Sequence, residues 1–225
     1  MTTKFQTETG QVPEVESSIR NWQRMHEEKY FQIHRCYQDR LYDDGVAMLR
    51  NLLDFQDTDD VLEIGCGYGR LMYHLAPTVS RITGIDLADE PLHEAAELLA
   101  EYDNVGLIHG SGCSLSDVAN YSIDKAYAFT VFQHIPDDLV KIYLDEVNRV
   151  LCPGGYFCAQ FLTGSGLPAK IEDEAREQSF CRNAAEICEY AENAGLEVYM
   201  LQREVLPRFI NLDWYWLLAR KIGKQ

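Results

Sequence analysis

The chain has 225 residues, of which 46% are hydrophobic and 25% are charged, so its composition is that of a globular protein and excludes disordered and fibrous classes. This length predicts one domain, with room for a short appendage. No stretch approaches the ~18 uninterrupted apolar residues of a membrane span. The polar segment 1–10 has no apolar signal-peptide core, which predicts a cytoplasmic location.

The charge is strongly negative, with 36 acidic against 20 basic residues and a formal net charge of -16. Such a surface repels phosphate backbones and anionic lipid headgroups, so we expect neither nucleic acid nor a membrane as partner. The 7 cysteines contain no C-x-x-C pair, which predicts reduced thiols and no zinc site. The composition does not indicate an oligomeric state.

Residues 14–55 have a helical pattern. An apolar and aromatic stripe recurs every three to five positions on the first stretch. A second helix is expected at about 39–54. The stripe consists of Trp22, Met25, Tyr30, Ile33 and Tyr37. We therefore expect a helical N-terminal segment, 1–55, ahead of a main domain, 56–225.

From residue 61 onward, short apolar runs alternate with helical patterns. Alternation of this kind predicts an α/β fold with a Rossmann-like, mainly parallel sheet of seven strands and helices on both faces. The last two strands are separated only by a loop, so they should form an antiparallel hairpin. The expected strands are 61–65, 81–87, 105–110, 124–132, 155–162, 197–205 and 213–221, and the expected helices are 71–76, 90–102, 136–151 and 183–195.

The most informative stretch reads VLEIGCGYGR, residues 61–70. A buried strand runs into three alternating glycines, and a helix opens after them. Glycine permits positive φ and a close approach of a ligand, while the first amides of a helix favour a negative group. Asp86 ends the next strand, where a carboxylate can accept both hydroxyls of a ribose. The alternative is a tight strand–helix turn with a chance acid.

The type of nucleoside is indicated by the residue after the glycines. The dinucleotide fingerprint G-x-G-x-x-G/A asks for a small residue where Arg70 stands, which argues against a nicotinamide-dependent oxidoreductase. The run 63–69 instead resembles motif I of the class I S-adenosylmethionine-dependent methyltransferases. The segments 84–87 (GIDL), 124–136 (DKAYAFTVFQHIP) and 151–157 (LCPGGYF) are similar to that family's next motifs, in order.

The resemblance implies S-adenosylmethionine as cofactor, S-adenosylhomocysteine as product, and a set of cofactor-binding residues. It also implies that the N-terminal helical segment 1–55 is a lid over the cofactor. The family often places an acid after its third strand against the adenine, whereas this chain has Ser111, Gly112 and Cys113. Either the Ser111 side chain or the backbone at Gly112 and Cys113 would replace the acid. The implied set runs from the methionine end to the adenine and the transferred methyl: Glu63, Gly65, Cys66, Gly67, Arg70, Asp86, Leu87, Gly112, Cys113, Phe129 and Thr130.

His134 is the candidate general base, because it follows the fourth strand and has an intrinsic pKa suited to neutral pH. Gln133 is the candidate for orienting an acceptor; alternatively, His134 only braces the loop before Pro136. Relatives that hold magnesium carry carboxylates where Phe129 and Thr130 stand, so no metal is expected. The Asn-Pro-Pro-Tyr signature of nucleobase amino methylation is also missing.

The acceptor pocket must come from residues outside the motifs. Aromatic and histidine side chains near both ends of the chain suit a flat or cationic small molecule, although core packing is the alternative. The candidates are Trp22, His26, Tyr30 and Trp214. We expect metal-independent methyl transfer to a small molecule, with O- or N-methylation favoured. A non-catalytic S-adenosylmethionine-binding regulatory subunit and a protein methyltransferase stay open.

Overall fold

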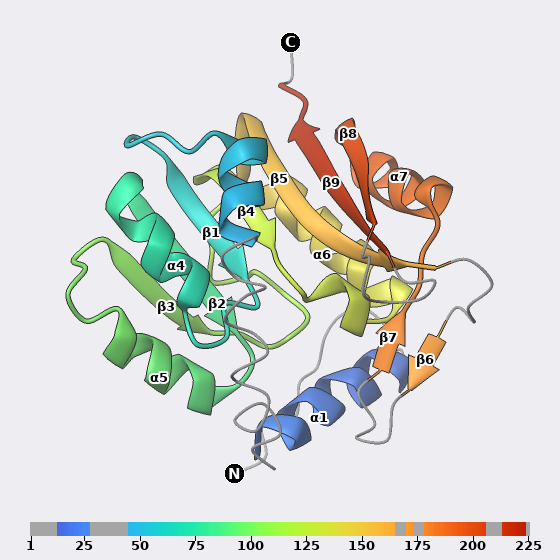
Figure 1. Cartoon of the computed structure of the whole chain (residues 1–225), viewed down its shortest axis with the longest axis horizontal. Helices are drawn as coiled ribbons and strands as arrows, with labels where there is room; N and C mark the ends of the chain where they lie inside the picture. The colour runs from blue at the N-terminus through green and yellow to red at the C-terminus, as the bar shows by residue number, and fades with distance from the viewer. Residues whose placement is uncertain (1–12, 28–44, 165–169, 173–177, 206–212, 224–225) are drawn as a thin grey trace.

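The structure is a computed structural model that describes residues 13–27, 45–164, 170–172, 178–205 and 213–223 (Figure 1). Its centre is a seven-stranded sheet in the order β3-β2-β1-β4-β5-β9-β8. The five strands β1 to β5 are parallel, and β9 runs antiparallel to both of its neighbours. The antiparallel pairing of β9 with β8 was predicted, whereas its pairing with β5 was not. The strands are β1 (Asp60–Ile64), β2 (Arg81–Asp86), β3 (Val105–His109), β4 (Ile123–Ala128), β5 (Leu151–Thr163), β8 (Leu196–Val205) and β9 (Asp213–Lys221).

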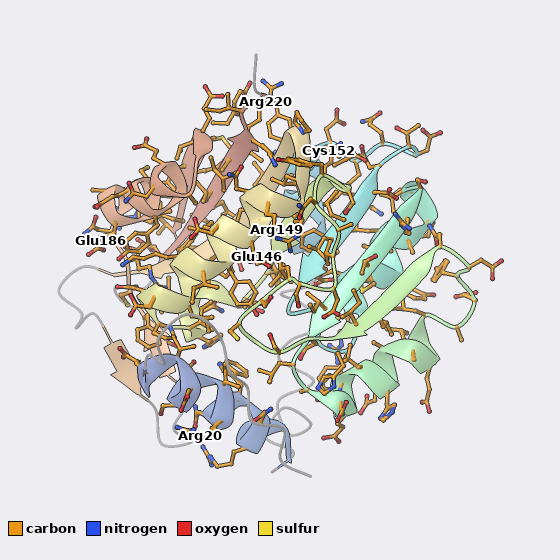
Figure 2. The ribbon with its side chains drawn as sticks, turned by 180° about the vertical axis from the view of Figure 1, so that it is seen from behind. Arg20, Glu146, Arg149, Cys152, Glu186 and Arg220 are labelled. Carbon is orange, nitrogen blue, oxygen red and sulfur yellow. The ribbon has the colours of Figure 1, made fainter. Side chains whose placement is uncertain are left out.

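Helices cover both faces of the sheet (Figure 1). One layer contains residues 45–53, α4 (Arg70–Leu75) and α5 (Asp89–Leu98). The other contains α6 (Asp137–Val150) and α7 (Ala184–Asn193), and Figure 2 shows this face with Glu146 and Arg149 on α6. Two short 3₁₀ turns, η1 (Ala76–Thr78) and η2 (Phe132–His134), follow α4 and β4.

The strands are apolar on both sides because each side meets a helix layer. In β1, Leu62 and Ile64 face the core beneath α6, while Val61 faces the core beneath α4. Helix α7 begins with a capping box: the Asn183 side chain accepts from the amide of Glu186, whose carboxylate accepts from the amide of Asn183. The two-sided core fixes the sheet, and the carboxyl ends of its parallel strands share one edge.

Some boundaries differ from the prediction. The apolar run 124–132 was expected to be one strand, but β4 ends at Ala128 and the chain turns into η2. β5 begins at Leu151, so the LCPGG segment is part of the strand, with a register shift opposite residues 123–125. The two strands β6 (Lys170–Glu172) and β7 (Gln178–Phe180) were not predicted, because three residues carry no readable period.

The N-terminal helix α1 (Pro13–Glu27) lies beside the β6–β7 hairpin in Figure 1. Of the predicted apolar stripe only Trp22 has a described side chain, and residues 28–44 lie outside the described ranges. Among the helices that the structure describes, none is long and apolar enough to cross a bilayer. The six described cysteines are free thiols.

Candidate active site

The glycine loop after β1 turns its backbone toward open space. Gly65, Gly67 and Gly69 have φ values of 72°, 49° and 73°, in the region that favours glycine. A Cβ at Gly65 would lie 2.4 Å from a methyl carbon of Val131, so this position has no room for a side chain. A Cβ at Gly67 would meet no atom within 4 Å. The loop therefore leaves space above its central residue, as a cradle for a ligand requires.

Asp86, at the end of β2, closes this cradle from the side. One of its carboxylate oxygens accepts a hydrogen bond from the Gly67 amide at 2.8 Å, and the other accepts from the Ala88 amide at 3.0 Å. A carboxylate oxygen has two lone-pair sites, so each can accept a further donor. The pair of hydroxyls on a ribose matches these two remaining sites.

Beyond Asp86, the same edge of the sheet is lined by Leu87, by Gly112 in the loop after β3, and by Ile19 of α1. A Cβ placed on Gly112, which has φ 79°, would lie 3.4 Å from side-chain carbons of both Leu87 and Ile19. Cys113 donates its amide to the Ser111 hydroxyl at 3.4 Å. Helix α1 thus reaches the loop after β3, and Leu87 and Gly112, two of the residues predicted to face the adenine, lie close together.

Glu63 and Tyr127 form a buried polar pair beneath the glycine loop. The Tyr127 hydroxyl donates to Glu63 Oε2 at 2.9 Å, and the Glu63 side chain is almost fully buried. Burial raises the pKa of the Glu63 carboxyl well above its ordinary value, and the charge of Asp86 raises it further. Burial likewise raises the pKa of the Cys66 thiol.

The Cys66 side chain points into the core rather than toward the cradle. A Cβ on Gly84 of β2 would be only 2.7 Å from Cys66 Sγ, which shows how closely the thiol packs on that strand. Only the backbone of Cys66 therefore belongs to the loop surface. The sequence could not show this, because either direction suits a small residue.

The chain turns sharply after β4. Thr130 has φ 55°, a left-handed conformation that a β-branched residue adopts only under strain. The ring of Phe129, just before it, packs against Trp216 with centroids 5.8 Å apart, and residue Gly45 leaves no space for a Cβ against the same ring. Phe129 is thus a buried wall, while Thr130 is a half-buried, strained residue at the sheet edge.

The turn η2 presents Gln133 and His134. Gln133 Nε2 lies 3.0 Å from His134 Nε2, and the imidazole meets the Trp22 indole edge-on with ring centroids 4.9 Å apart. Trp22 also donates its indole N–H to the backbone oxygen of His134 at 3.5 Å. Gln133 is buried, and its Oε1 has no hydrogen-bond partner. These two predicted catalytic candidates and Trp22 therefore stand together.

A scan against protein families matches residues 61–155 to the model described as "Methyltransferase domain". The matched segment begins at β1, includes the glycine loop, Asp86 and η2, and ends within β5. Residues 61–155 are therefore similar to a methyltransferase domain, in agreement with the motifs of the sequence. The cofactor of that family is S-adenosylmethionine, and the space above Gly67 together with the free lone pairs of Asp86 fits it.

Curated relatives of the methyltransferase domain include a demethylmenaquinone methyltransferase of Staphylococcus aureus. It is 30% identical over 145 residues, which are 55% of this chain and 57% of the relative. The chain thus spans little more than half the length of the curated relatives it matches.

Solved structures share the fold. The Burkholderia thailandensis 1,6-didemethyltoxoflavin-N1-methyltransferase, with bound 1,6-didemethyltoxoflavin and S-adenosylhomocysteine, is 20% identical. It has a TM-score of 0.77 over 97% of this chain and 94% of that chain. The [4+2]-cyclase SpnF is 18% identical, with a TM-score of 0.68 over 80% of this chain and 82% of that chain. At these identities the likeness shows the fold alone.

The remaining predicted site residues make no contact given above with the glycine loop or with His134. Arg70 is the first residue of α4, and it is half-buried. Trp214 lies near the start of β9, opposite Leu162 of β5. His26 belongs to α1, but its side chain lies outside the described ranges, as does the whole of Tyr30. No group of three or more potential ligands arranged to hold a metal occurs among the described residues.

Sequence reasoning missed two residues that shape the site. Tyr127 partners Glu63, and their pairing in register across β1 and β4 was a signal that strand alternation could have given. Arg182 is buried and hydrogen-bonds the backbone oxygens of Phe132, the first residue of η2, and of Ile135, the residue after it. No sequence pattern distinguishes such an arginine from a solvent-exposed one.

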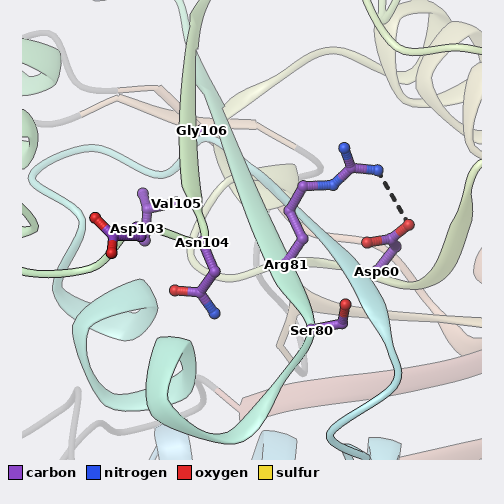
Figure 3. A pocket seen from close by; sticks show the side chains of 7 residues that line it. All are labelled: Asp60, Ser80, Arg81, Asp103, Asn104, Val105 and Gly106. Atoms are coloured by element: carbon purple, nitrogen blue, oxygen red, sulfur yellow. Dashed lines mark hydrogen bonds and ion pairs between the residues drawn. The ribbon is translucent and has the colours of Figure 1, made fainter.

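A polar pocket at the opposite end of the sheet is not part of this site. Figure 3 shows its lining by the amino ends of β2 and β3 and the residues before them, with an ion pair of 3.0 Å between Arg81 and Asp60. In parallel α/β sheets ligands bind beyond the carboxyl ends of the strands, where the glycine loop lies. We therefore assign this pocket no part in the proposed site.

Proposed function

We propose that the chain transfers a methyl group from S-adenosylmethionine to a small-molecule acceptor. The observation that carries this proposal is the cradle of Gly67 and Asp86: a glycine open to space, with a carboxylate whose two oxygens each keep one free acceptor site. The bound cofactor would supply an electrophilic methyl group on a sulfonium. The small-molecule acceptor class is supported by the names of the demethylmenaquinone and didemethyltoxoflavin relatives.

The chain's own contribution is to bind and align. Asp86 would accept the ribose hydroxyls, Leu87 and Gly112 would contact the adenine, and the backbone of 65–67 would contact the methionine end. Holding two reactants in line accounts for roughly 7–11 kcal/mol of a bimolecular barrier. Alignment alone is therefore sufficient for large acceleration.

His134 would accept the proton that an O–H or N–H acceptor loses. Its imidazole stands on the turn after β4, where the Gln133 amide nitrogen lies 3.0 Å from His134 Nε2 and can only donate to it. The proton would therefore go to Nε2 as this hydrogen bond from Gln133 breaks. A general base contributes about 10²- to 10⁴-fold. For this reason O- or N-methylation is the proposed bond type, with Gln133 orienting the acceptor and Trp22 and Trp214 as candidate walls of its pocket.

Two further features belong to the proposal. Transfer would be independent of metal, because Phe129 and Thr130 offer no carboxylate at the end of β4. Residues 1–55 would act as a lid on a domain of residues 56–225, because Ile19 of α1 adjoins Leu87 and Gly112 while Trp22 contacts His134. A lid of this kind would exclude water from the reacting groups.

The test has two stages. Calorimetric titration with S-adenosylhomocysteine, beside NADH as control, is expected to give micromolar binding of the first compound only. Single-turnover incubation of methyl-labelled S-adenosylmethionine with a metabolite extract, with and without EDTA, should then label a small molecule equally in both. Binding without any labelled product would favour a regulatory subunit, labelled protein would favour a protein methyltransferase, and NADH binding alone would refute the cofactor.

A further inference from the structure

Arg182 is a buried cation attached to the turn that carries His134. Only 3% of the residue is exposed. Its guanidinium donates to the backbone oxygen of Phe132 at 2.7 Å and to that of Ile135 at 2.7 Å, and its Nε donates to Asp137 Oδ1 at 2.8 Å. The two carbonyls lie on either side of Gln133 and His134. One planar group therefore holds both ends of a turn whose middle contains the proposed base.

The guanidinium is itself fixed from several directions. Its central carbon lies 5.6 Å from the centroid of the Phe180 ring and 5.9 Å from that of Phe161. The Arg182 amide donates to the backbone oxygen of Leu162 at 2.9 Å, which joins this segment to the end of β5. Because both the backbone and the guanidinium of Arg182 are held in place, its planar N–H donors keep the two backbone oxygens that they bind in fixed positions.

We propose that Arg182 is the positioning residue for His134, and that it sets the imidazole's orientation and proton affinity without touching the substrate. This inference rests on the proposed function, which gives His134 a proton to accept. A lysine in its place would keep the charge, but a single ammonium on a flexible stem cannot bridge two carbonyls in a fixed plane. The turn would then be released at one end, and the contact of His134 with Gln133 would loosen.

The chain contains a control, because Arg149 makes the same three kinds of bond elsewhere, with further bonds to Asn120 and Glu146. Its guanidinium donates to the backbone oxygens of Val118 and Leu115 at 2.9 and 2.8 Å, and its Nε donates to Glu146 at 2.7 Å. It fixes the loop between β3 and β4 rather than η2. Arg149→Lys therefore removes an equivalent bridge without altering the turn that carries His134.

The experiment is a pH titration of the full chain labelled with ¹⁵N-histidine, followed by NMR, free and saturated with S-adenosylhomocysteine. The signal of His134 is assigned as the one missing in His134→Gln. In Arg182→Lys we expect a shifted titration midpoint for His134 and ring nitrogen signals closer to an average of the two tautomers. Arg149→Lys should leave that signal where it is in the wild type. Affinity for S-adenosylhomocysteine should fall by no more than about tenfold in Arg182→Lys, the most that loss of the Trp22–His134 contact would cost, and should be unchanged in Arg149→Lys.

Asp137→Asn keeps the test decisive if Arg182→Lys does not fold. Half of the Asp137 side chain is exposed, and the substitution removes the charge partner of Arg182 while leaving both carbonyl bonds. A smaller movement of the His134 signal in the same direction is expected. An unmoved His134 signal in the folded variant, or an equal movement in Arg149→Lys, overturns the proposal. If the wild type does not bind S-adenosylhomocysteine, the proposed function fails, while the titration of the free protein still decides the role of Arg182.

Discussion

The indole of Trp22 lies edge-on to the imidazole of His134, with ring centroids 4.9 Å apart, and so ties helix α1 to the turn after β4. Ile19, one turn earlier on α1, adjoins Leu87 and Gly112 at the other end of the same edge. The helix thus touches both ends of the proposed cofactor site. If helix α1 lost either of these contacts, that end of the proposed cofactor site would be open to solvent.

Trp22→Ala is expected to weaken binding of S-adenosylhomocysteine by roughly 0.5–1.5 kcal/mol, the usual value of an aromatic edge contact. The loss should appear as faster dissociation, because the helix would close less firmly over the ligand. Surface plasmon resonance of the wild type and the variant measures both rates. Gln23→Ala, at an exposed position of the same helix, is the control and should change neither rate. Equal dissociation from all three proteins would contradict the lid.

Asp86→Ala is expected to weaken S-adenosylhomocysteine binding by roughly 1–3 kcal/mol, the cost of leaving charge-assisted hydrogen bonds unmade. The free protein should also lose stability, because the amides of Gly67 and Ala88 lose their acceptor. Titration calorimetry and thermal unfolding measure the two effects. Asp89→Ala is the control: Asp89 is largely exposed and pairs with His109 at 3.2 Å, an interaction of little value in water. An affinity loss as large in the control would show that general charge, not the ribose contact, is responsible.

The sheet could be predicted from the sequence because strand and helix periods alternate along it. The run VLEIGCGYGR and the acid Asp86 fixed the switch from β1 to α4 and the end of β2. The limits of the prediction lie where backbone strain overrides the apolar pattern. Nothing in residues 124–132 indicates that Thr130 takes a positive φ, and the predicted strand is therefore four residues too long.

The site was less predictable than the fold because orientation is a property of packing. Cys66 was assigned to the ligand surface, but its thiol packs on Gly84, and the direction of a side chain is not visible in a motif. Arg182 lies 48 positions after His134 in the chain and meets its turn only through tertiary structure. Local patterns predicted which residues gather at the edge, and long-range contacts determined how they are held.

Glu63→Gln is expected to change how stability depends on pH. The folded-state pKa of the Glu63 carboxyl is raised by burial, so the folded protein holds this proton more tightly than the unfolded chain. The resulting stabilisation is complete below the ordinary pKa of about 4.5 and is lost as pH rises through the raised value. The free energy of unfolding of the wild type should therefore fall relative to that of Glu63→Gln as pH increases. Urea denaturation of both proteins over a pH series measures this difference.

Glu146→Gln is the control for this prediction, with the opposite sign. The hydrogen bond from Arg149 lowers the pKa of Glu146, so its stabilisation is present above the ordinary value and is lost as pH falls through the lowered one. The wild type should accordingly gain stability over Glu146→Gln as pH rises. Parallel curves for the wild type and Glu63→Gln would mean that Glu63 is ionised in the folded protein, contrary to its burial beside Tyr127.

Thr130→Gly tests whether the strained turn after β4 serves ligand binding. The left-handed conformation costs a non-glycine residue roughly 1–2 kcal/mol. The greater freedom of glycine in the unfolded chain offsets part of that gain, so we expect a net increase in stability of about 1 kcal/mol or less. Binding of S-adenosylhomocysteine should weaken by about 0.5–1 kcal/mol, because a freer backbone must be ordered when the ligand arrives.

Asp54→Gly is the matched control, because Asp54 also has a positive φ, 45°, and follows the helix of residues 45–53 away from the glycine loop. It should become more stable without any change in affinity. Chemical denaturation and calorimetry on both variants separate relief of strain from loss of order at the site. If Thr130→Gly gains stability and binds as tightly as the wild type, the strain at Thr130 is a by-product of the turn. If it binds more weakly while Asp54→Gly does not, the strain keeps the turn ready for the ligand, in agreement with the clustering of such conformations at functional sites.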